Sequence, residues 1–151
     1  EKMGTRVDIA KNSITIEGTS EIKPFNIKTE SFPGFPTDLQ AQFMVAALLA
    51  DGESKIIEEI FPSRFIHVAE LRKLGANIKL KNNSAIVNGG TSLNGARMQA
   101  SDLRASACLI LAGIIAKNKS EINRVYHLDR GYEKIDSKLM NLGVKIWREK
   151  E

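Results

Sequence analysis

Hydrophobic positions along the chain follow two spacings, one typical of strands and one typical of helices. Residues 77–81 and 84–88 alternate or run apolar on either side of an Asn82-Asn83 pair, which predicts a β-hairpin. Longer segments with apolar residues three and four apart predict helices. The other predicted strands cover residues 25–29, 54–60, 96–100 and 120–125, and the predicted helices cover 38–50, 65–74, 103–116 and 132–142.

The predicted helices are of two kinds. Segments 38–50 and 103–116 are apolar on nearly every side, so we expect both helices to be buried on every side. Segment 65–74 carries a single apolar stripe, which places it on the outside of the fold. That stripe consists of Phe65, Val68, Leu71 and Leu74. The pattern predicts buried parallel helices surrounded by sheets and outer helices.

Several residues mark the ends of these helices. Thr37 and Gln40 have the spacing of a capping box, and Ser101 is the expected N-cap of the helix that follows it. Gly75 and Gly143 stand directly after predicted helices, where a glycine at the C′ position commonly ends one.

The order of elements repeats along the chain. Gly4, Gly75 and Gly143 recur about every 70 residues, a period longer than that of most solenoid repeats. Each unit has the order β-α-β-α-β-β, so we predict a mixed α/β (α+β) fold. Residues 1–18 are expected to end one repeat, residues 19–90 to form a complete one, and residues 91–151 to form most of another. We therefore expect an incomplete domain from a longer polypeptide, with uncovered edges that favour self-association.

Composition and charge exclude several classes of protein for this chain. The chain is 42% hydrophobic and 26% charged, and its longest apolar run is too short to span a membrane. A single cysteine excludes an internal disulfide and suits the cytoplasm. The net charge of +4 favours anionic partners, but no run of lysines and arginines indicates a nucleic acid.

Two aspartates occupy equivalent repeat positions. Asp38 and Asp102 each begin a helix of the buried kind. Each carboxylate either complements the helix dipole or lies at the mouth of a site, where it takes a proton. Two prolines and a glycine within residues 33–36 form an irregular loop that delivers Asp38 rigidly, which favours the second interpretation there.

Three arginines also stand at the ends of predicted elements. Arg64 and Arg130 follow strands at equivalent positions, and Arg104 comes two residues after Asp102. Guanidinium groups match carboxylate and phosphate oxygens, so these arginines either surround one anionic ligand or form ordinary surface ion pairs.

The remaining candidates for chemistry are weak. His67, His127 and Cys108 form no metal-binding motif, so we expect no metal and no cofactor. Both histidines are interpreted as structural or surface residues. Cys108 lies within an apolar run and is interpreted as a packed small hydrophobic residue.

Four motifs together resemble a known family. They are residues 35–43 (FPTDLQAQF), 60–68 (IFPSRFIHV), 101–107 (SDLRASA) and 126–133 (YHLDRGYE). In order and spacing they resemble the C-terminal part of the UDP-N-acetylglucosamine 1-carboxyvinyltransferases, bacterial enolpyruvyl transferases of peptidoglycan synthesis. The resemblance implies an inside-out α/β barrel and a cytoplasmic enzyme that serves cell wall growth and division.

The resemblance also implies roles for individual residues. Asp38 matches the aspartate that binds the sugar 3′-hydroxyl and takes its proton, and Ile60 and Phe61 match contacts with the nucleotide sugar. Arg130 matches an arginine that holds phosphoenolpyruvate. The other matched residues, which line the cleft, are Arg64, Arg104 and Asp102.

The family's reactive cysteine and two further groups that hold phosphoenolpyruvate have no counterpart in this chain. We therefore expect these residues alone to be inactive and to need the N-terminal part of the same polypeptide as a partner. Two alternatives stay open. One is transfer to shikimate 3-phosphate by the sister enzyme, and the other is a non-catalytic repeat domain that binds an anion or a protein.

Overall fold

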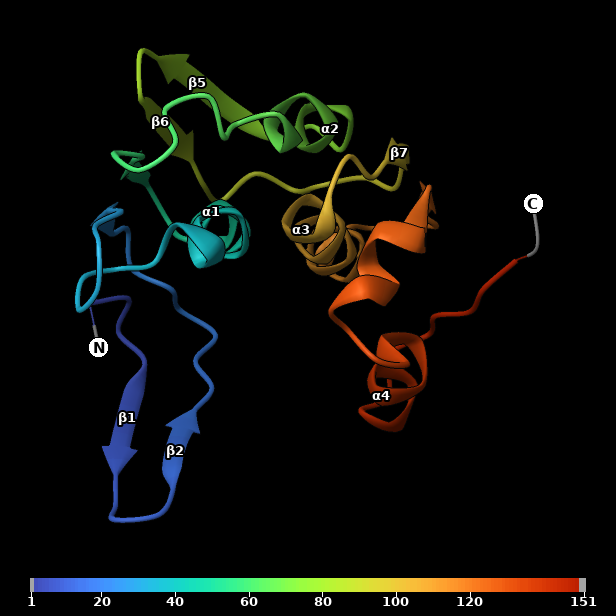
Figure 1. The fold of residues 1–151 in the computed structure, drawn as a ribbon, viewed down its shortest axis with the longest axis horizontal. Helices are drawn as coiled ribbons and strands as arrows, with labels where there is room; N and C mark the ends of the chain where they lie inside the picture. The colour runs from blue at the N-terminus through green and yellow to red at the C-terminus, as the bar shows by residue number, and fades with distance from the viewer. Residues whose placement is uncertain (1, 150–151) are drawn as a thin grey trace.

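The computed structural model describes residues 2–149 (Figure 1). Along the chain the elements are β1 (Arg6–Ile9), β2 (Ile14–Glu17), β3 (Asn26–Lys28), the 3₁₀ helix η1 (Thr37–Leu39), α1 (Gln40–Leu49), β4 (Glu53–Ile57), α2 (His67–Lys73), β5 (Asn77–Lys81), β6 (Ser84–Asn88), β7 (Arg97–Gln99), α3 (Leu103–Ile115), β8 (Glu121–Asn123), the 3₁₀ helix η2 (Val125–Arg130) and α4 (Ile135–Asn141). From β3 to β6 this is the predicted order β-α-β-α-β-β.

The strands form three separate sheets within the described residues. The largest has the order β3-β4-β6-β5, in which β3 is parallel to β4 and the other pairs are antiparallel. The predicted hairpin is confirmed, and its two strands have the predicted bounds. Its tight turn forms because Asn82 takes the left-handed conformation (φ 54°) that such a turn requires. β1 pairs with β2 in a second hairpin, and β7 runs parallel to β8.

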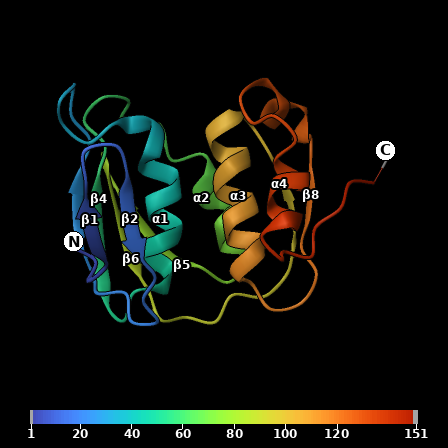
Figure 2. The same ribbon diagram turned by 90° about the horizontal axis from the view of Figure 1, so that it is seen from below.

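Helices α1 and α3 lie side by side at the centre of the molecule, as Figure 2 shows. The four-stranded sheet packs on α1, while η2 and β8 pack on α3. Met44, Leu48 and Leu109 are almost completely buried in the main core that these helices share. The mixed α/β fold with central helices is therefore as predicted.

Burial of α1 and α3 on every side is not observed. Leu49, Leu111 and Ile114 are 47%, 39% and 38% exposed, because no described element packs over these positions. The β1–β2 hairpin, which extends away from the body in Figure 1, likewise leaves Ile9 and Ile14 exposed. Apolar side chains thus remain exposed on the two central helices and on the β1–β2 hairpin.

Helix α2 lies on the outside, as its single stripe predicts. Phe65, Val68, Leu71 and Leu74 are all buried. The helix is shorter than predicted because the backbone from Arg64 to Phe65 is occupied by turns, with the N–H groups of both residues bonded within residues 61–65.

The predicted helix stops and the predicted start of α3 at Leu103 are confirmed, whereas the predicted N-terminal caps are not. Gly75 and Gly143 follow α2 and α4 with φ values of 93° and 90°, a conformation that costs glycine little. Asp102, not Ser101, is the N-cap of α3. The predicted capping box is also wrong, because the Thr37 hydroxyl bonds to the carboxylate of Glu58 rather than to the backbone of α1.

Three elements are shorter than their predicted ranges for identifiable reasons. β4 ends at Ile57 because the Glu58 carboxylate binds the N–H groups of the residues that follow. β8 ends at Asn123 because Arg124 is left-handed, with φ 61°. α4 begins only at Ile135, since Lys134 (φ 46°) interrupts the predicted helix.

Candidate active site

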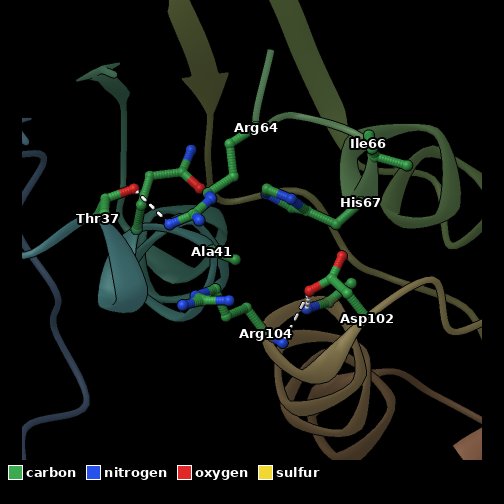
Figure 3. Close-up of a pocket in the computed structure, with 9 residues that line it drawn as sticks. Thr37, Ala41, Arg64, Ile66, His67, Asp102 and Arg104 are labelled. Atoms are coloured by element: carbon green, nitrogen blue, oxygen red, sulfur yellow. Dashed lines mark hydrogen bonds between the residues drawn. The ribbon is translucent and has the colours of Figure 1, made fainter. Parts of the chain in front are cut away.

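A small polar cavity lies where α1, α2 and α3 begin (Figure 3). Its volume of about 30 Å³ admits roughly two water molecules, so a larger ligand contacts only the side chains at its rim. Three helix starts far apart in the sequence meet here. The lining residues are Thr37, Gln40, Ala41, Arg64, Ile66, His67, Asp102, Arg104 and Ala105.

Asp38 stands beside this cavity, in η1, and its side chain is 60% exposed. Its Oδ1 accepts a hydrogen bond from Nε of Arg104 at 2.5 Å and another from Nη1 of Arg64 at 3.2 Å. The Arg104 hydrogen bond, assisted by Arg64, lowers the pKa of the carboxyl group below its usual 3.8. The carboxylate is therefore ionised at neutral pH. Oδ2 forms no hydrogen bond within residues 2–149 and is available to a ligand.

The two arginines reach Asp38 from different elements. Arg64 follows β4, and Arg104 lies in the first turn of α3. Nη1 of Arg64 also donates to the Thr37 hydroxyl at 2.9 Å, and its guanidinium group lies 4.1 Å from the centre of the Phe61 ring. The fold thus brings together three residues that the sequence singled out.

Asp102 has a structural task at the start of α3. Its Oδ1 accepts the backbone N–H groups of Arg104 and Ala105 at 2.9 and 3.1 Å, and its Oδ2 accepts the Ser101 hydroxyl at 3.0 Å. Burial raises the pKa of Asp102, but these hydrogen bonds outweigh it and the net pKa is lowered. Asp102 also lines the cavity.

The charges of this cluster balance. Two guanidinium groups, from Arg64 and Arg104, meet two ionised carboxylates, from Asp38 and Asp102. The described residues at the cavity therefore do not form the positive cluster that recognition of a phosphorylated substrate calls for, and further cations are needed.

Arg130, the remaining predicted cation, is not brought into this cluster. It ends η2, is exposed, and forms no hydrogen bond or ion pair with any residue in 2–149. The next residue, Gly131, lies against the Leu103 side chain, so the Arg130 backbone stands near the start of α3. Arg130 is not among the residues that line the cavity.

Ile60 and Phe61 lie beside the arginine side of the cluster. Their backbone N–H groups both donate to Oε1 of Glu58 at 3.0 Å. Phe61 is 48% exposed, and its ring packs against Arg64. Phe61 therefore lies against one of the two arginines that contact Asp38.

Sequence reasoning missed three polar residues of the site. Gln40 is fully buried, and neither amide atom has a partner among the described residues. His67 is 4% exposed, and burial lowers its pKa to about 4 against an opposing effect of Asp102. Glu58 is completely buried. The strand period could have revealed Glu58, because it shares the inward face of β4 with Ser54 and Ile56.

Other expectations concern groups outside the cluster. Cys108 is fully buried in the core, where burial raises the pKa of its thiol, so its interpretation as a packed hydrophobic residue is confirmed. Over the part of the chain that the structure describes, no three acidic, histidine or cysteine side chains are grouped to hold a metal ion. No helix in that part has the length and apolar character needed to span a membrane.

Comparison with known proteins assigns the family. A family model described as EPSP synthase (3-phosphoshikimate 1-carboxyvinyltransferase) matches residues 1–139. The chain belongs to the EPSP synthase family. Among curated members, it is 51% identical over 145 residues to the UDP-N-acetylglucosamine 1-carboxyvinyltransferase of Methylacidiphilum infernorum (isolate V4), covering 96% of this chain and 34% of the relative. It is 53% identical over 151 residues to the enzyme of that name from Sulfurovum sp. (strain NBC37-1), covering all of this chain and 36% of the relative.

Two solved structures agree with the fold. The enolpyruvyl transferase NikO from Streptomyces tendae superposes with a TM-score of 0.86 at 28% identity, over 95% of this chain and 34% of NikO. The EPSP synthase of Acinetobacter baumannii superposes with a TM-score of 0.61 at 16% identity, over 80% of this chain and 29% of that protein, which shows the shared fold alone.

These comparisons confirm the resemblance inferred from the four motifs. The curated relatives bear the predicted name, and the solved structures are those of enolpyruvyl transferases. The chain spans about a third of the length of the relatives it matches.

Proposed function

We propose that this chain is part of a UDP-N-acetylglucosamine 1-carboxyvinyltransferase. The complete enzyme, in which these residues belong to a polypeptide of the relatives' length, transfers the enolpyruvyl group of phosphoenolpyruvate to the 3′-hydroxyl of UDP-N-acetylglucosamine and releases phosphate. The observation that carries the proposal is the ionised, exposed Asp38 carboxylate, held by Arg104 and Arg64 with one oxygen left for a ligand.

In this reaction Asp38 takes the proton of the sugar hydroxyl. A proton adds to the methylene carbon of phosphoenolpyruvate, and the 3′-oxygen bonds to the adjacent cationic carbon. The bond from that carbon to the phosphate oxygen then breaks, phosphate leaves, and loss of a methyl proton restores the double bond. A carboxylate with a low pKa is a weak base. Proton transfer to Asp38 therefore accompanies formation of the C–O bond, when the hydroxyl becomes acidic.

The other predicted site residues bind and orient the substrates. Ile60 and Phe61 contact the nucleotide sugar, while Arg64 and Arg104 orient Asp38 and face the anionic cosubstrate. Since these two arginines are balanced by carboxylates, Arg130 and cations outside this chain supply the excess positive charge that stabilises the departing phosphate.

The names of the relatives favour UDP-N-acetylglucosamine over shikimate 3-phosphate as acceptor. Curated proteins named for the nucleotide sugar are 51–53% identical to the chain over 96% or more of its length. The EPSP synthase of Acinetobacter baumannii is only 16% identical to it. We further propose that the enzyme works in the cytoplasm and serves peptidoglycan synthesis, and with it cell growth and division.

The remainder of the enzyme is the proposed partner of the uncovered apolar surfaces. These surfaces lie on α3, at Leu111 and Ile114, and on the β1–β2 hairpin, at Ile9 and Ile14. We retain residues 1–18, 19–90 and 91–151 as the successive repeats of the incomplete domain. Alone, the chain is expected to be inactive and to associate with itself through these surfaces.

The test is phosphate release from phosphoenolpyruvate with either acceptor. The complete enzyme is expected to turn over UDP-N-acetylglucosamine and not shikimate 3-phosphate, whereas the 151-residue chain turns over neither. Turnover of shikimate 3-phosphate alone would assign the sister activity. A folded complete protein that uses neither acceptor would overturn the proposal and favour a binding domain.

A further inference from the structure

Glu58 is a buried carboxylate at the end of β4 that no predicted role explains. Its side chain is 0% exposed, and no cationic side chain in residues 2–149 forms an ion pair with it. Removing a lone carboxylate from water is unfavourable unless hydrogen bonds replace the lost hydration. A carboxyl group in such a place therefore needs hydrogen-bond donors, and the structure supplies four.

The donors come from two sides of the site. Oε1 accepts the Thr29 hydroxyl at 2.8 Å and the backbone N–H groups of Ile60 and Phe61 at 3.0 Å each. Oε2 accepts the Thr37 hydroxyl at 2.9 Å. One carboxylate thus links the segment before Asp38 to the segment that carries Phe61 and leads to Arg64.

The direction of the Thr37 hydrogen bonds follows from chemistry. Arg64 can only donate, so the Thr37 oxygen accepts from its Nη1 at 2.9 Å. The Thr37 hydroxyl keeps its own proton for donation, and it donates that proton to Oε2 of Glu58. The resulting chain runs Arg64 to Thr37 to Glu58, and the same Nη1 of Arg64 also bonds to Asp38.

The second arm of Glu58 reaches Arg64 as well. The bonds to the Ile60 and Phe61 N–H groups turn the chain at the end of β4, and the Phe61 ring then packs 4.1 Å from the Arg64 guanidinium carbon. Both arms therefore restrain one guanidinium group, which in turn restrains the proposed base.

We propose that Glu58 is a positioning residue that orients Asp38 through Thr37 and Arg64. The inference rests on the proposed function, because it assigns Glu58 a task in that reaction. It predicts that disturbing the Thr37 contact alone impairs the chemical step more than it impairs binding of the nucleotide sugar.

Glu58→Gln in the complete enzyme tests this most directly. The amide oxygen can still accept the N–H groups of Ile60 and Phe61, but the amide NH₂ then faces a Thr37 oxygen that already accepts from Arg64. We expect kcat to fall about 10- to 100-fold, the scale of a catalytic group displaced by about 1 Å, while KM for UDP-N-acetylglucosamine changes by less than about threefold. Glu59→Gln, at the exposed neighbouring carboxylate, is the matched control and should leave both constants unchanged.

A second pair of variants keeps the test open if Glu58→Gln does not fold. Thr37→Val removes the hydroxyl at constant shape and should reproduce the loss of kcat, whereas Thr37→Ser retains the hydroxyl and should restore most of it. A Thr37→Val enzyme with wild-type kcat, or a Glu58→Gln enzyme that folds and loses only affinity, would overturn the proposal.

An NMR titration of the Asp38 carboxyl carbon gives a readout that needs no turnover. Among the described residues, Arg104 and Arg64 are the charged groups that lower the pKa of the Asp38 carboxyl. Displacement of Arg64 in Glu58→Gln should therefore raise the Asp38 midpoint, and an unchanged midpoint would contradict the proposal. If the wild-type enzyme has no turnover with either acceptor, the proposed function fails, yet this titration still decides whether Glu58 controls Asp38.

Discussion

The starts of α1 and α3 are equivalent in sequence but differ in structure. Each has an aspartate after a small polar residue, followed by leucine and an apolar helix. Asp102 bonds to the backbone of its own helix, whereas Asp38 bonds to side chains from elsewhere and α1 has no side-chain cap. An aspartate that caps a helix has its oxygens occupied, and one held by arginines at the surface keeps an oxygen for a ligand. Of two aspartates at equivalent repeat positions, one can therefore stabilise a helix while the other is free to contact a ligand.

The largest expected effect is a difference in enzyme activity between variants of Asp38 and of Asp102. Asp38→Asn in the complete enzyme should lower kcat for phosphate release by about 10²- to 10⁴-fold, because the amide cannot take the hydroxyl proton. Asp102→Asn is the matched control, since asparagine caps helices nearly as well as aspartate. Its loss of kcat should be clearly smaller. Equal losses would show that both carboxylates take part in the reaction.

The second effect concerns His67, which faces Asp102 from the start of α2. Its folded pKa of about 4 lies below the ordinary 6.5, so between these values the unfolded chain binds more protons. Stability is therefore full above pH 6.5 and falls as the pH drops toward 4, by about 3 kcal/mol in total. Urea unfolding of the complete enzyme across this range should show the fall.

His67→Phe should remove most of that pH dependence. The same measurement on His127→Asn, at the chain's other histidine, identifies which residue is responsible. A slope that disappears with His127 instead, or that persists in both variants, would contradict the assignment to His67.

The third effect reverses the ranking of the aspartates. Asp102→Ala should lower the free energy of unfolding by about 1 kcal/mol, the usual cost of losing an N-cap. Asp38→Ala should change it little, because that carboxylate is 60% exposed and caps no helix. Urea unfolding of both variants measures the difference. A larger loss for Asp38→Ala would mean that its arginine contacts support the fold more than the cap does.

The smallest effect distinguishes Ser101 from Asp102. The Ser101 hydroxyl donates to Asp102 Oδ2 at 3.0 Å but makes no contact with the backbone of α3. Ser101→Ala should therefore change the free energy of unfolding by less than about 0.5 kcal/mol. A loss as large as that of Asp102→Ala would restore Ser101 as the effective cap.

Much of the fold was predictable because it depends on local pattern. The bounds of the β5–β6 hairpin and the stops at Gly75 and Gly143 follow from a turn pair and from glycine's freedom at positive φ. N-terminal caps were less predictable. The Thr37 hydroxyl could have capped α1, but in the fold it bonds to the distant carboxylate of Glu58. A local motif states which bonds a residue can form, and not which partner is nearest in the fold.

Most residues of the candidate site were predictable from the sequence, but the hydrogen bonds between them were not. Asp38, Arg64 and Arg104 were identified from their positions at element ends and from the motifs, and they lie in contact. Arg130 was identified in the same way, yet its side chain is not part of the cluster. Glu58 belongs to no motif, and the capping pattern that contains Gln40 gives no sign that its amide is buried, because such burial depends on neighbours from distant parts of the chain.

The sequence by itself determined the element order from β3 to β6, the outer position of α2 and the family. These properties depend on the 2- and 3.6-residue periods of the backbone and on short motifs, which are contained within a few consecutive positions. Only the tertiary structure decided that Asp38 faces two arginines and that a buried Glu58 links the two sides of the site. Arg104 bonds to Asp38 across 66 positions of sequence. Such a pair exists because α1 and α3 pack together, and packing is a property of the whole chain.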